Sequence, residues 1–187
     1  MSFAHGNDLC LTFWADAYDL GVVTFPQDAS VLEIGCAEGD WIAPMLRDRP
    51  DLRITGIDMR KTKRKAAHLI HGDVLKADFA PASFDAIVAI STLEHIGLGA
   101  YQDPLDPDGD RATFLLCAQW LKPGGWVYAD VPYRPKGPYT VQRSHRTYDP
   151  EAYGARFAHP DLTQVWSKLY EPHHQDGPFL ASVWQKA

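Results

Sequence analysis

Apolar runs alternate with segments of helical pattern along the first two thirds of the chain. The clearest run covers 84–91, where residues 87–90 are apolar without interruption. Such a run is typical of a strand that is buried on both faces of a parallel sheet. The other predicted strands cover 31–35, 53–58, 69–72 and 126–131, and the predicted helices cover 7–20, 40–47, 61–68 and 111–121. Strands that alternate with helices in this way predict an α/β domain.

The C-terminal part of the chain has a different pattern. Segments 163–170 and 179–185 are both strand-like, and the loop between them is too short for a helix. Two strands joined in this way are expected to pair antiparallel. A parallel sheet that ends in an antiparallel hairpin is unlike a plain dinucleotide-binding domain.

Length and composition indicate one domain over residues 1–187 in a cytoplasmic protein. The chain contains no run of 18 apolar residues, and its first ten residues lack the features of a signal peptide. Three widely spaced cysteines predict reduced thiols. The net charge of −6 argues against a nucleic acid as partner. The basic run at 60–65 predicts the solvated face of a helix, with binding of a phosphorylated or nucleic-acid substrate as the alternative.

The loop after the first predicted strand is rich in glycine. Glycine at a strand-to-helix turn lets the backbone approach a ligand and exposes the N–H groups of the following helix. The dinucleotide fingerprint G-x-G-x-x-G fails twice, because Ala37 and Asp40 occupy two of its glycine positions. The pattern acid-x-G-x-G-x-G is met at Glu33, Gly35 and Gly39, and only Ala37 departs from it.

Acidic residues follow the second and third predicted strands. Asp58 lies 19 residues after Gly39, at the end of the second strand. A carboxylate at this position of a nucleotide-binding fold accepts hydrogen bonds from ribose hydroxyls. Asp73 follows the third strand and suits the exocyclic amine of adenine.

Together these segments resemble the ordered motifs of class I S-adenosylmethionine-dependent methyltransferases. The motifs are VLEIGC at 31–36, GID at 56–58, GD at 72–73, FD at 84–85 with LEH at 93–95, and LKPGG at 121–125. The resemblance implies a Rossmann-like three-layer sandwich with a mostly parallel, seven-stranded sheet and a C-terminal antiparallel hairpin. It also implies S-adenosylmethionine as the cofactor.

The same resemblance implies roles for single residues. Glu33, Gly35 and Gly39 would surround the methionine moiety, with Ala37 in the same loop, and Asp58 would hold the ribose. Met59 would lie against the adenine ring, Asp73 and Val74 at its edge, and Ser91 near the amino-acid end.

Three further segments narrow the resemblance. EHIGLG at 94–99, DPLDPDGD at 103–110 and SHRTY at 144–148 are similar to a bacterial family of methyltransferase-like domains of unknown function. No substrate can be transferred from that family, so this resemblance narrows the fold assignment and does not identify the reaction.

Candidate catalytic residues follow the fourth and fifth strands, because ligands of open α/β sheets lie beyond the carboxyl ends of the strands. Glu94 and His95 follow the fourth strand, and His145 lies beyond the fifth. An imidazole titrates near neutral pH, so His95 is a candidate base for a hydroxyl acceptor. The alternative is that His95 orients its loop or packs near the cofactor.

Two other groups of residues have a functional and a structural interpretation. The acidic loop contains Asp103, Asp106, Asp108 and Asp110. It lacks the register of a calcium loop, so we expect turns and a helix cap there rather than a metal. Trp14 and Tyr18 are predicted to be core residues, with closure over the cofactor as the alternative.

The sequence therefore predicts methyl transfer to a small-molecule acceptor, such as a saccharide or another metabolite. The acceptor pocket would come from the first helix, the 97–110 loop and the 132–150 segment, or from the second subunit of a homodimer. A catalytically silent S-adenosylmethionine-binding module remains an alternative, and Ala37 favours it. A nicotinamide-dependent oxidoreductase is the second alternative. The failed glycine register and the antiparallel end of the sheet argue against it.

Overall fold

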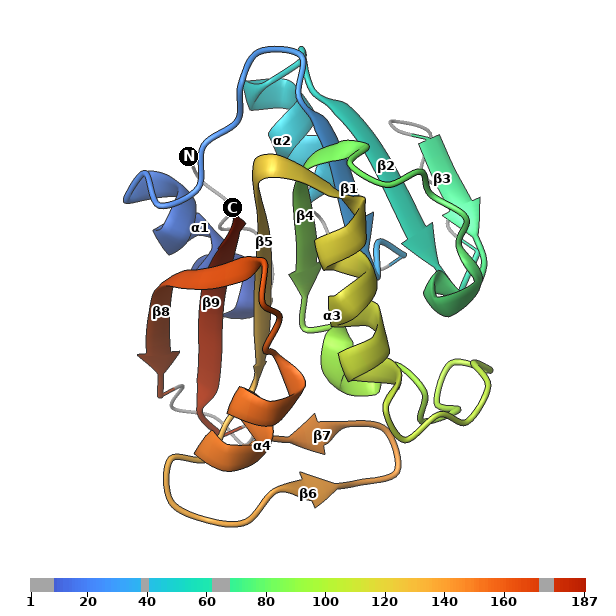
Figure 1. The fold of residues 1–187 in the computed structure, drawn as a ribbon, viewed down its shortest axis with the longest axis vertical. Helices are drawn as coiled ribbons and strands as arrows, with labels where there is room; N and C mark the ends of the chain where they lie inside the picture. Colours follow the sequence, from blue (N-terminus) through green and yellow to red (C-terminus); the bar gives the residue numbers. More distant parts are fainter. Residues whose placement is uncertain (1–8, 38–40, 62–67, 172–176) are drawn as a thin grey trace.

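The computed structural model describes residues 9–37, 41–61, 68–171 and 177–187 (Figure 1). Its main sheet has seven strands in the order β3-β2-β1-β4-β5-β9-β8. The strands are β1 (Ser30–Ile34), β2 (Arg53–Asp58), β3 (His68–His71), β4 (Phe84–Ile90), β5 (Leu121–Pro132), β8 (Leu162–Tyr170) and β9 (Phe179–Lys186). The first five run parallel, and β9 pairs antiparallel with both β5 and β8. The predicted fold class is confirmed.

Helices cover both faces of this sheet. They are α1 (Leu9–Asp19), α2 (Ile42–Asp48), α3 (Gly109–Trp120) and α4 (Pro150–Arg156). Buried residues of α1 and α2 belong to one apolar core, and those of α3 and α4 belong to another. Figure 1 shows α3 and α4 in front of the sheet. The result is the expected three-layer sandwich.

The strand order reverses between β1 and β4. From β1 the chain proceeds outward to β2 and β3, then returns to place β4 on the other side of β1. The loops that leave β1 and β4 therefore turn in opposite directions and leave a crevice at the carboxyl ends of the strands. The register places Glu33 of β1 between Gly56 of β2 and Val88 of β4.

Several element boundaries differ from the sequence predictions. The helix predicted at 111–121 ends at Trp120, and Leu121 already pairs with Phe84. The register then shifts, so that Trp126 pairs with Ala86 and the Pro-Gly-Gly sequence lies within β5. The helix predicted at 61–68 falls mostly outside the described residues. The helix prediction is wrong for its last residue, His68, which is the first residue of β3.

Short elements were not predicted at all. They are the 3-10 helices η1 (Val74–Lys76) and η2 (Leu93–His95), the helix α4, and the hairpin of β6 (Thr140–Val141) and β7 (Arg146–Thr147). Each has too few residues to show a hydrophobic period. Three of them, η1, η2 and the hairpin, carry candidate site residues.

Trp14 of α1 is the centre of an aromatic cluster. Its ring lies 5.0 Å from the ring of Tyr128, 5.3 Å from that of Trp41 and 5.9 Å from that of Trp126. Tyr18 packs beside Trp14 and donates its hydroxyl to Asp48. The interpretation of Trp14 as a core residue is confirmed, because its side chain is fully buried among other rings.

Cys10, Cys36 and Cys117 are buried, and none of them forms a disulfide bond among the described residues. None of the described helices is both long enough and apolar enough to cross a bilayer.

Replacement of Trp14 by alanine tests the aromatic cluster. We expect Trp14→Ala to lower the free energy of unfolding by about 3–5 kcal/mol, because the indole leaves a cavity among rigid rings. Leu20→Ala is the control, since Leu20 is 65% exposed at the end of the same helix; its effect should stay within about 0.5 kcal/mol. Urea unfolding measures both, and equal effects would contradict this description of the core.

Candidate functional site

A cavity of about 300 Å³ opens at the carboxyl ends of the parallel strands. Its volume is at the lower end of the range for small-molecule sites. The sequence-predicted residues that line it are Glu33, Gly35, Asp58, Met59, Asp73, Val74, Ser91 and His95. Residues that sequence reasoning missed also line it: Cys10 and Leu11 from α1, Arg60 from the basic run, and Thr92, Ile96, Tyr101 and Asp103 from the segment after β4.

Gly35 is required by the packing of this wall. Its φ angle is +84°, in the left-handed region. A Cβ atom at this position would lie 2.2 Å from the Oγ1 atom of Thr92, which itself donates to the Ile90 carbonyl. The loops after β1 and β4 thus meet at Gly35, and a side chain there would push them apart.

Asp58 is a buried carboxylate with an almost complete set of donors. Its Oδ2 atom accepts from the Ala37 N–H at 2.9 Å, and its Oδ1 atom accepts from the Arg60 N–H at 2.7 Å. The Arg60 side chain adds Nε and Nη2 contacts, both at 3.1 Å. Ala37 therefore reaches the site through its backbone and does not itself line the cavity. Gly39 lies outside the described residues.

Arg60 also links the two sides of the cavity. Its guanidinium lies 4.4 Å from the centre of the Tyr101 ring, a cation–π distance. Tyr101 is held by Asp103, whose carboxylate accepts from the N–H groups of Tyr101 and Gly97. The contact between Arg60 and Tyr101 joins the end of β2 to the loop that follows η2.

Asp73 caps the N-terminus of η1 and lines the same cavity. Its Oδ1 atom accepts from the Leu75 N–H at 3.0 Å, and its Oδ2 atom lies 3.5 Å from the Lys76 ammonium. The carboxylate is thus fixed by a helix cap while it faces the cavity.

Two buried acids lie behind the cavity wall, on either side of Ser91. The Ser91 N–H donates to Asp130 Oδ1 at 3.0 Å, and its hydroxyl donates to Glu94 Oε1 at 2.7 Å. Ser91 has a φ angle of +43°, which is unfavourable for a residue with a side chain. Neither acid lines the cavity; both reach it through Ser91.

Burial raises the pKa of both carboxyls. Desolvation raises the pKa of Glu94, against the opposing effects of His95 and the Ser91 hydroxyl. Desolvation raises the pKa of Asp130 well above its ordinary value, and the charge of Glu94 raises it further. Two neighbouring carboxyls in a dry interior do not both ionise readily, so Asp130 holds its proton more strongly.

His95 projects from η2 into the cavity wall. Its Nδ1 atom is hydrogen-bonded to the carbonyl oxygen of Ser144, and its Nε2 atom lies 3.6 Å from Glu94 Oε1. Its ring packs edge-on against Tyr101 and against His145. His145 therefore lies beside His95, although it does not line the cavity.

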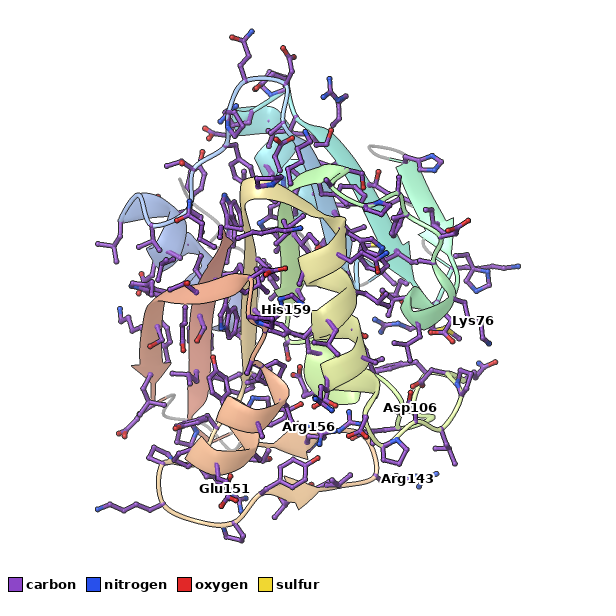
Figure 2. The ribbon with its side chains drawn as sticks, in the orientation of Figure 1. Lys76, Asp106, Arg143, Glu151, Arg156 and His159 are labelled. Atoms are coloured by element: carbon purple, nitrogen blue, oxygen red, sulfur yellow. The ribbon has the colours of Figure 1, made fainter. Side chains whose placement is uncertain are left out.

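The acidic loop is occupied by turn and ion-pair contacts. Asp106 accepts from the Asp108 N–H, and Asp110 is fully buried at the start of α3. Arg156 extends from α4 toward this end of α3 (Figure 2) and contacts both oxygens of Asp110 at 2.7 Å. No cluster of three or more metal-ligating side chains is found in the part of the chain that the structure describes.

Asp130→Asn tests the buried acid pair. The raised pKa means that folded protein retains a proton that the unfolded chain loses, so wild-type stability falls as the pH rises above about 4. Asparagine keeps an oxygen for the Ser91 N–H and does not titrate. We expect the stability of the variant, relative to wild type, to increase from pH 5 to pH 8. Urea unfolding at both values measures this, and a difference between the two proteins that stays constant over that range would show that Asp130 is ionised in the fold.

Comparison with known proteins agrees with this geometry. A profile of the methyltransferase-domain family matches residues 11–173. The ubiquinone biosynthesis O-methyltransferase of Paracidovorax citrulli is 27% identical over 163 residues, which are 78% of this chain and 59% of that protein. The chain thus spans less than two thirds of the length of this relative.

Two solved structures share the fold. The 1,6-didemethyltoxoflavin-N1-methyltransferase of Burkholderia thailandensis, with bound S-adenosylhomocysteine, has a TM-score of 0.71 at 19% identity, covering 97% of this chain and 80% of that one. The [4+2]-cyclase SpnF has a TM-score of 0.72 at 13% identity, covering 94% and 80%. The fold and the family profile agree, and the chain belongs to the methyltransferase-domain family of class I S-adenosylmethionine-dependent methyltransferases.

Proposed function

We propose that this chain transfers a methyl group from S-adenosylmethionine to a small-molecule acceptor. The observation that carries the proposal is the meeting of Glu33, Asp58 and Asp73 around one cavity. These acids come from the carboxyl ends of three neighbouring strands, on the side where α/β sheets bind nucleotides. Membership of the methyltransferase-domain family supports the same assignment.

The residues of the cavity fit the parts of the cofactor. Asp58 would accept hydrogen bonds from the ribose hydroxyls, in place of the Arg60 side chain. Met59 and Val74 offer apolar surface to the adenine, and Asp73 offers an acceptor to its amine. Glu33 and the backbone at Gly35 are left for the methionine end, next to Ser91, with Ala37 and Gly39 in the same loop.

The cofactor supplies an activated methyl group, so the chain has mainly to orient the acceptor and to take up its proton. In this proposal, the acceptor hydroxyl or amine gives its proton to Nε2 of His95 as the new bond to the methyl group forms. The imidazolium that results would be stabilised by Glu94, whose Oε1 atom is 3.6 Å away. His145 would line the approach of the acceptor beside His95.

The acceptor class is drawn from the relatives. The matched proteins include an O-methyltransferase of ubiquinone biosynthesis and an N1-methyltransferase of a small heterocycle. A planar hydroxylated ring, a heterocycle and a saccharide are therefore the acceptors to test first. The silent-module alternative differs in one respect, because it predicts cofactor binding without turnover.

Asp58→Asn tests the ribose contact. We expect calorimetry to show that S-adenosylhomocysteine binds to the wild type and that it binds about 10- to 100-fold more weakly to the variant. This corresponds to roughly 1.5–3 kcal/mol for hydrogen bonds to a charged group. Asp78→Asn is the matched control, because Asp78 is exposed outside the cavity. Absence of binding to the folded wild type would refute the cofactor assignment.

Arg60→Ala tests whether arginine competes with the ribose for Asp58. We expect S-adenosylhomocysteine to bind about 2- to 5-fold more tightly, because an ion pair of up to about 1 kcal/mol no longer has to be broken. Arg53→Ala, at the exposed start of β2, should leave binding unchanged. Weaker binding by Arg60→Ala would mean that the guanidinium assists the ligand instead.

Turnover separates an enzyme from a silent module. Purified protein with S-adenosylmethionine is incubated with a panel of catechols, phenols, heterocycles and saccharides, and S-adenosylhomocysteine release is measured. We expect release with at least one acceptor class and a loss of about 100-fold in His95→Gln, the size of a general-base contribution. Tight binding of the cofactor without release from any acceptor would favour the silent module.

A further inference from the structure

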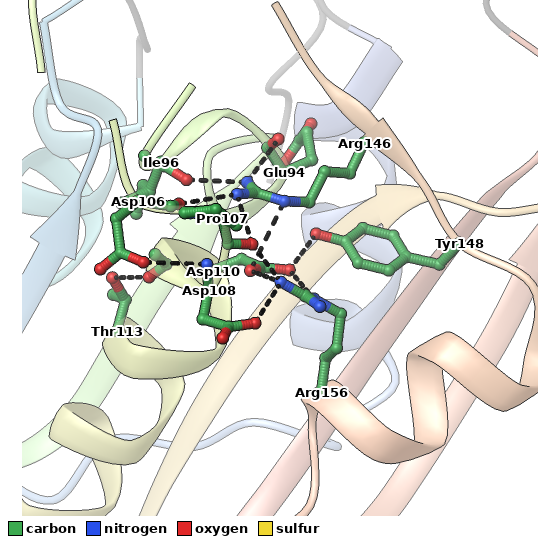
Figure 3. A network of polar contacts seen from close by, with 12 residues as sticks. Glu94, Ile96, Asp106, Pro107, Asp108, Asp110, Thr113, Arg146, Tyr148 and Arg156 are labelled. Atoms are coloured by element: carbon green, nitrogen blue, oxygen red, sulfur yellow. Dashed lines mark hydrogen bonds and ion pairs between the residues drawn. The ribbon is translucent and has the colours of Figure 1, made fainter. Parts of the chain in front are cut away.

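Arg146 is a fully buried arginine at the start of β7. It belongs to the SHRTY segment, in which the proposed function gives a role to His145 but none to Arg146. Its Nη1 atom donates to the carbonyl oxygens of Glu94 at 3.3 Å and Ile96 at 2.7 Å, and its Nη2 atom donates to those of Asp106 at 3.2 Å and Pro107 at 3.1 Å (Figure 3). One guanidinium therefore holds the backbone of η2 and of the loop that follows it.

The charge of Arg146 is balanced by Asp110. The Nε atom of Arg146 lies 3.6 Å from Asp110 Oδ1. The same carboxylate also contacts Arg156 and accepts from the Tyr148 hydroxyl at 2.7 Å. A charge taken out of water persists only when it is paired and hydrogen-bonded, so this network fixes the orientation of the guanidinium.

The contacts of Arg146 bracket His95. Glu94 and Ile96 are its two neighbours in the chain, so the backbone is held on both sides of the histidine. Ser144, two residues before Arg146, provides the carbonyl oxygen that binds Nδ1 of the same histidine. Arg146 and the turn that precedes it thus fix both the backbone and the ring of His95.

The Ser144 contact decides which ring nitrogen carries the proton. A carbonyl oxygen only accepts, so the donor must be Nδ1–H. In the neutral ring, the lone pair then lies on Nε2, the nitrogen nearer to Glu94.

We infer that Arg146 is a positioning residue, which holds His95 as the Nδ1–H tautomer and so keeps Nε2 available as a proton acceptor. The inference rests on the proposed role of His95. If Arg146 only stabilised the fold through its ion pair, contact with Asp110 would be enough. Contacts with the carbonyl oxygens of Glu94 and Ile96, on either side of His95, would not be needed. The chain instead directs one nitrogen of the guanidinium, Nη1, to those two carbonyls.

Nitrogen-15 NMR of histidine-labelled protein tests this inference without an acceptor. His95→Gln assigns the resonances of His95. In the wild type we expect the neutral His95 ring almost entirely as the Nδ1–H tautomer. Arg146→Lys keeps the charge, but a single ammonium cannot reach all four carbonyls. In this variant we expect the Nδ1–H fraction to fall below half, with at most a twofold change in S-adenosylhomocysteine affinity.

Two variants separate positioning from stability. Arg143→Lys lies in the same β6–β7 turn, at an exposed position, and should leave the tautomer unchanged. We expect Asp110→Asn to destabilise the fold, because it removes the buried countercharge. Asparagine still offers an amide oxygen to Arg146, and the four carbonyl acceptors of the guanidinium are unchanged, so the tautomer should be kept.

A wild-type ring in the Nε2–H form would overturn the inference, even if Arg146→Lys fails to fold. An unchanged tautomer in folded Arg146→Lys, or its loss in Asp110→Asn, would overturn it as well. Failure of the wild type to bind S-adenosylhomocysteine is a separate result, because it refutes the cofactor proposal and leaves the tautomer measurement valid.

Discussion

One buried carboxylate, Asp110, lies between two guanidinium groups, and the acceptor side of the cavity depends on it. Arg146 and Arg156 come from the chain after β5, whereas Asp110 begins α3. A buried ion pair contributes little net stability compared with apolar packing, but removal of one partner costs about 3–5 kcal/mol. The effect of this cluster is therefore to fix geometry: it holds the loop after η2 against the β6–β7 hairpin.

The cavity is thus built by two different physical means. Its cofactor side follows from the strand order, because the ends of β1, β2 and β4 must lie next to one another once the sheet forms. Its acceptor side consists of loops, which need specific polar contacts to hold one conformation. The Arg60–Tyr101 contact joins the two sides, so a ligand that displaces Arg60 from Asp58 also acts on the loop that carries Tyr101.

The fold alone does not set the reaction. The same architecture is found in the 1,6-didemethyltoxoflavin-N1-methyltransferase and in the [4+2]-cyclase SpnF, which are 19% and 13% identical to this chain. Function depends on the side chains placed on a fold. In the function proposed for this chain, those side chains are His95, Glu94 and Arg146, whereas the strands only support them.

The sequence by itself determined the sheet, its antiparallel ending and the carboxylates Glu33, Asp58 and Asp73, because strand patterns are local and the ends of parallel strands converge. Only the tertiary structure decided that Asp58 is paired with Arg60, that the acidic loop binds arginine and backbone N–H groups, and that Ser144 holds His95. The partners of the acidic loop and of His95 are up to 49 residues apart in the chain, and they lie in turns, a hairpin and a short helix that show no hydrophobic period. A pattern along the chain reports which face of an element is buried; it does not report which distant polar group that face will meet.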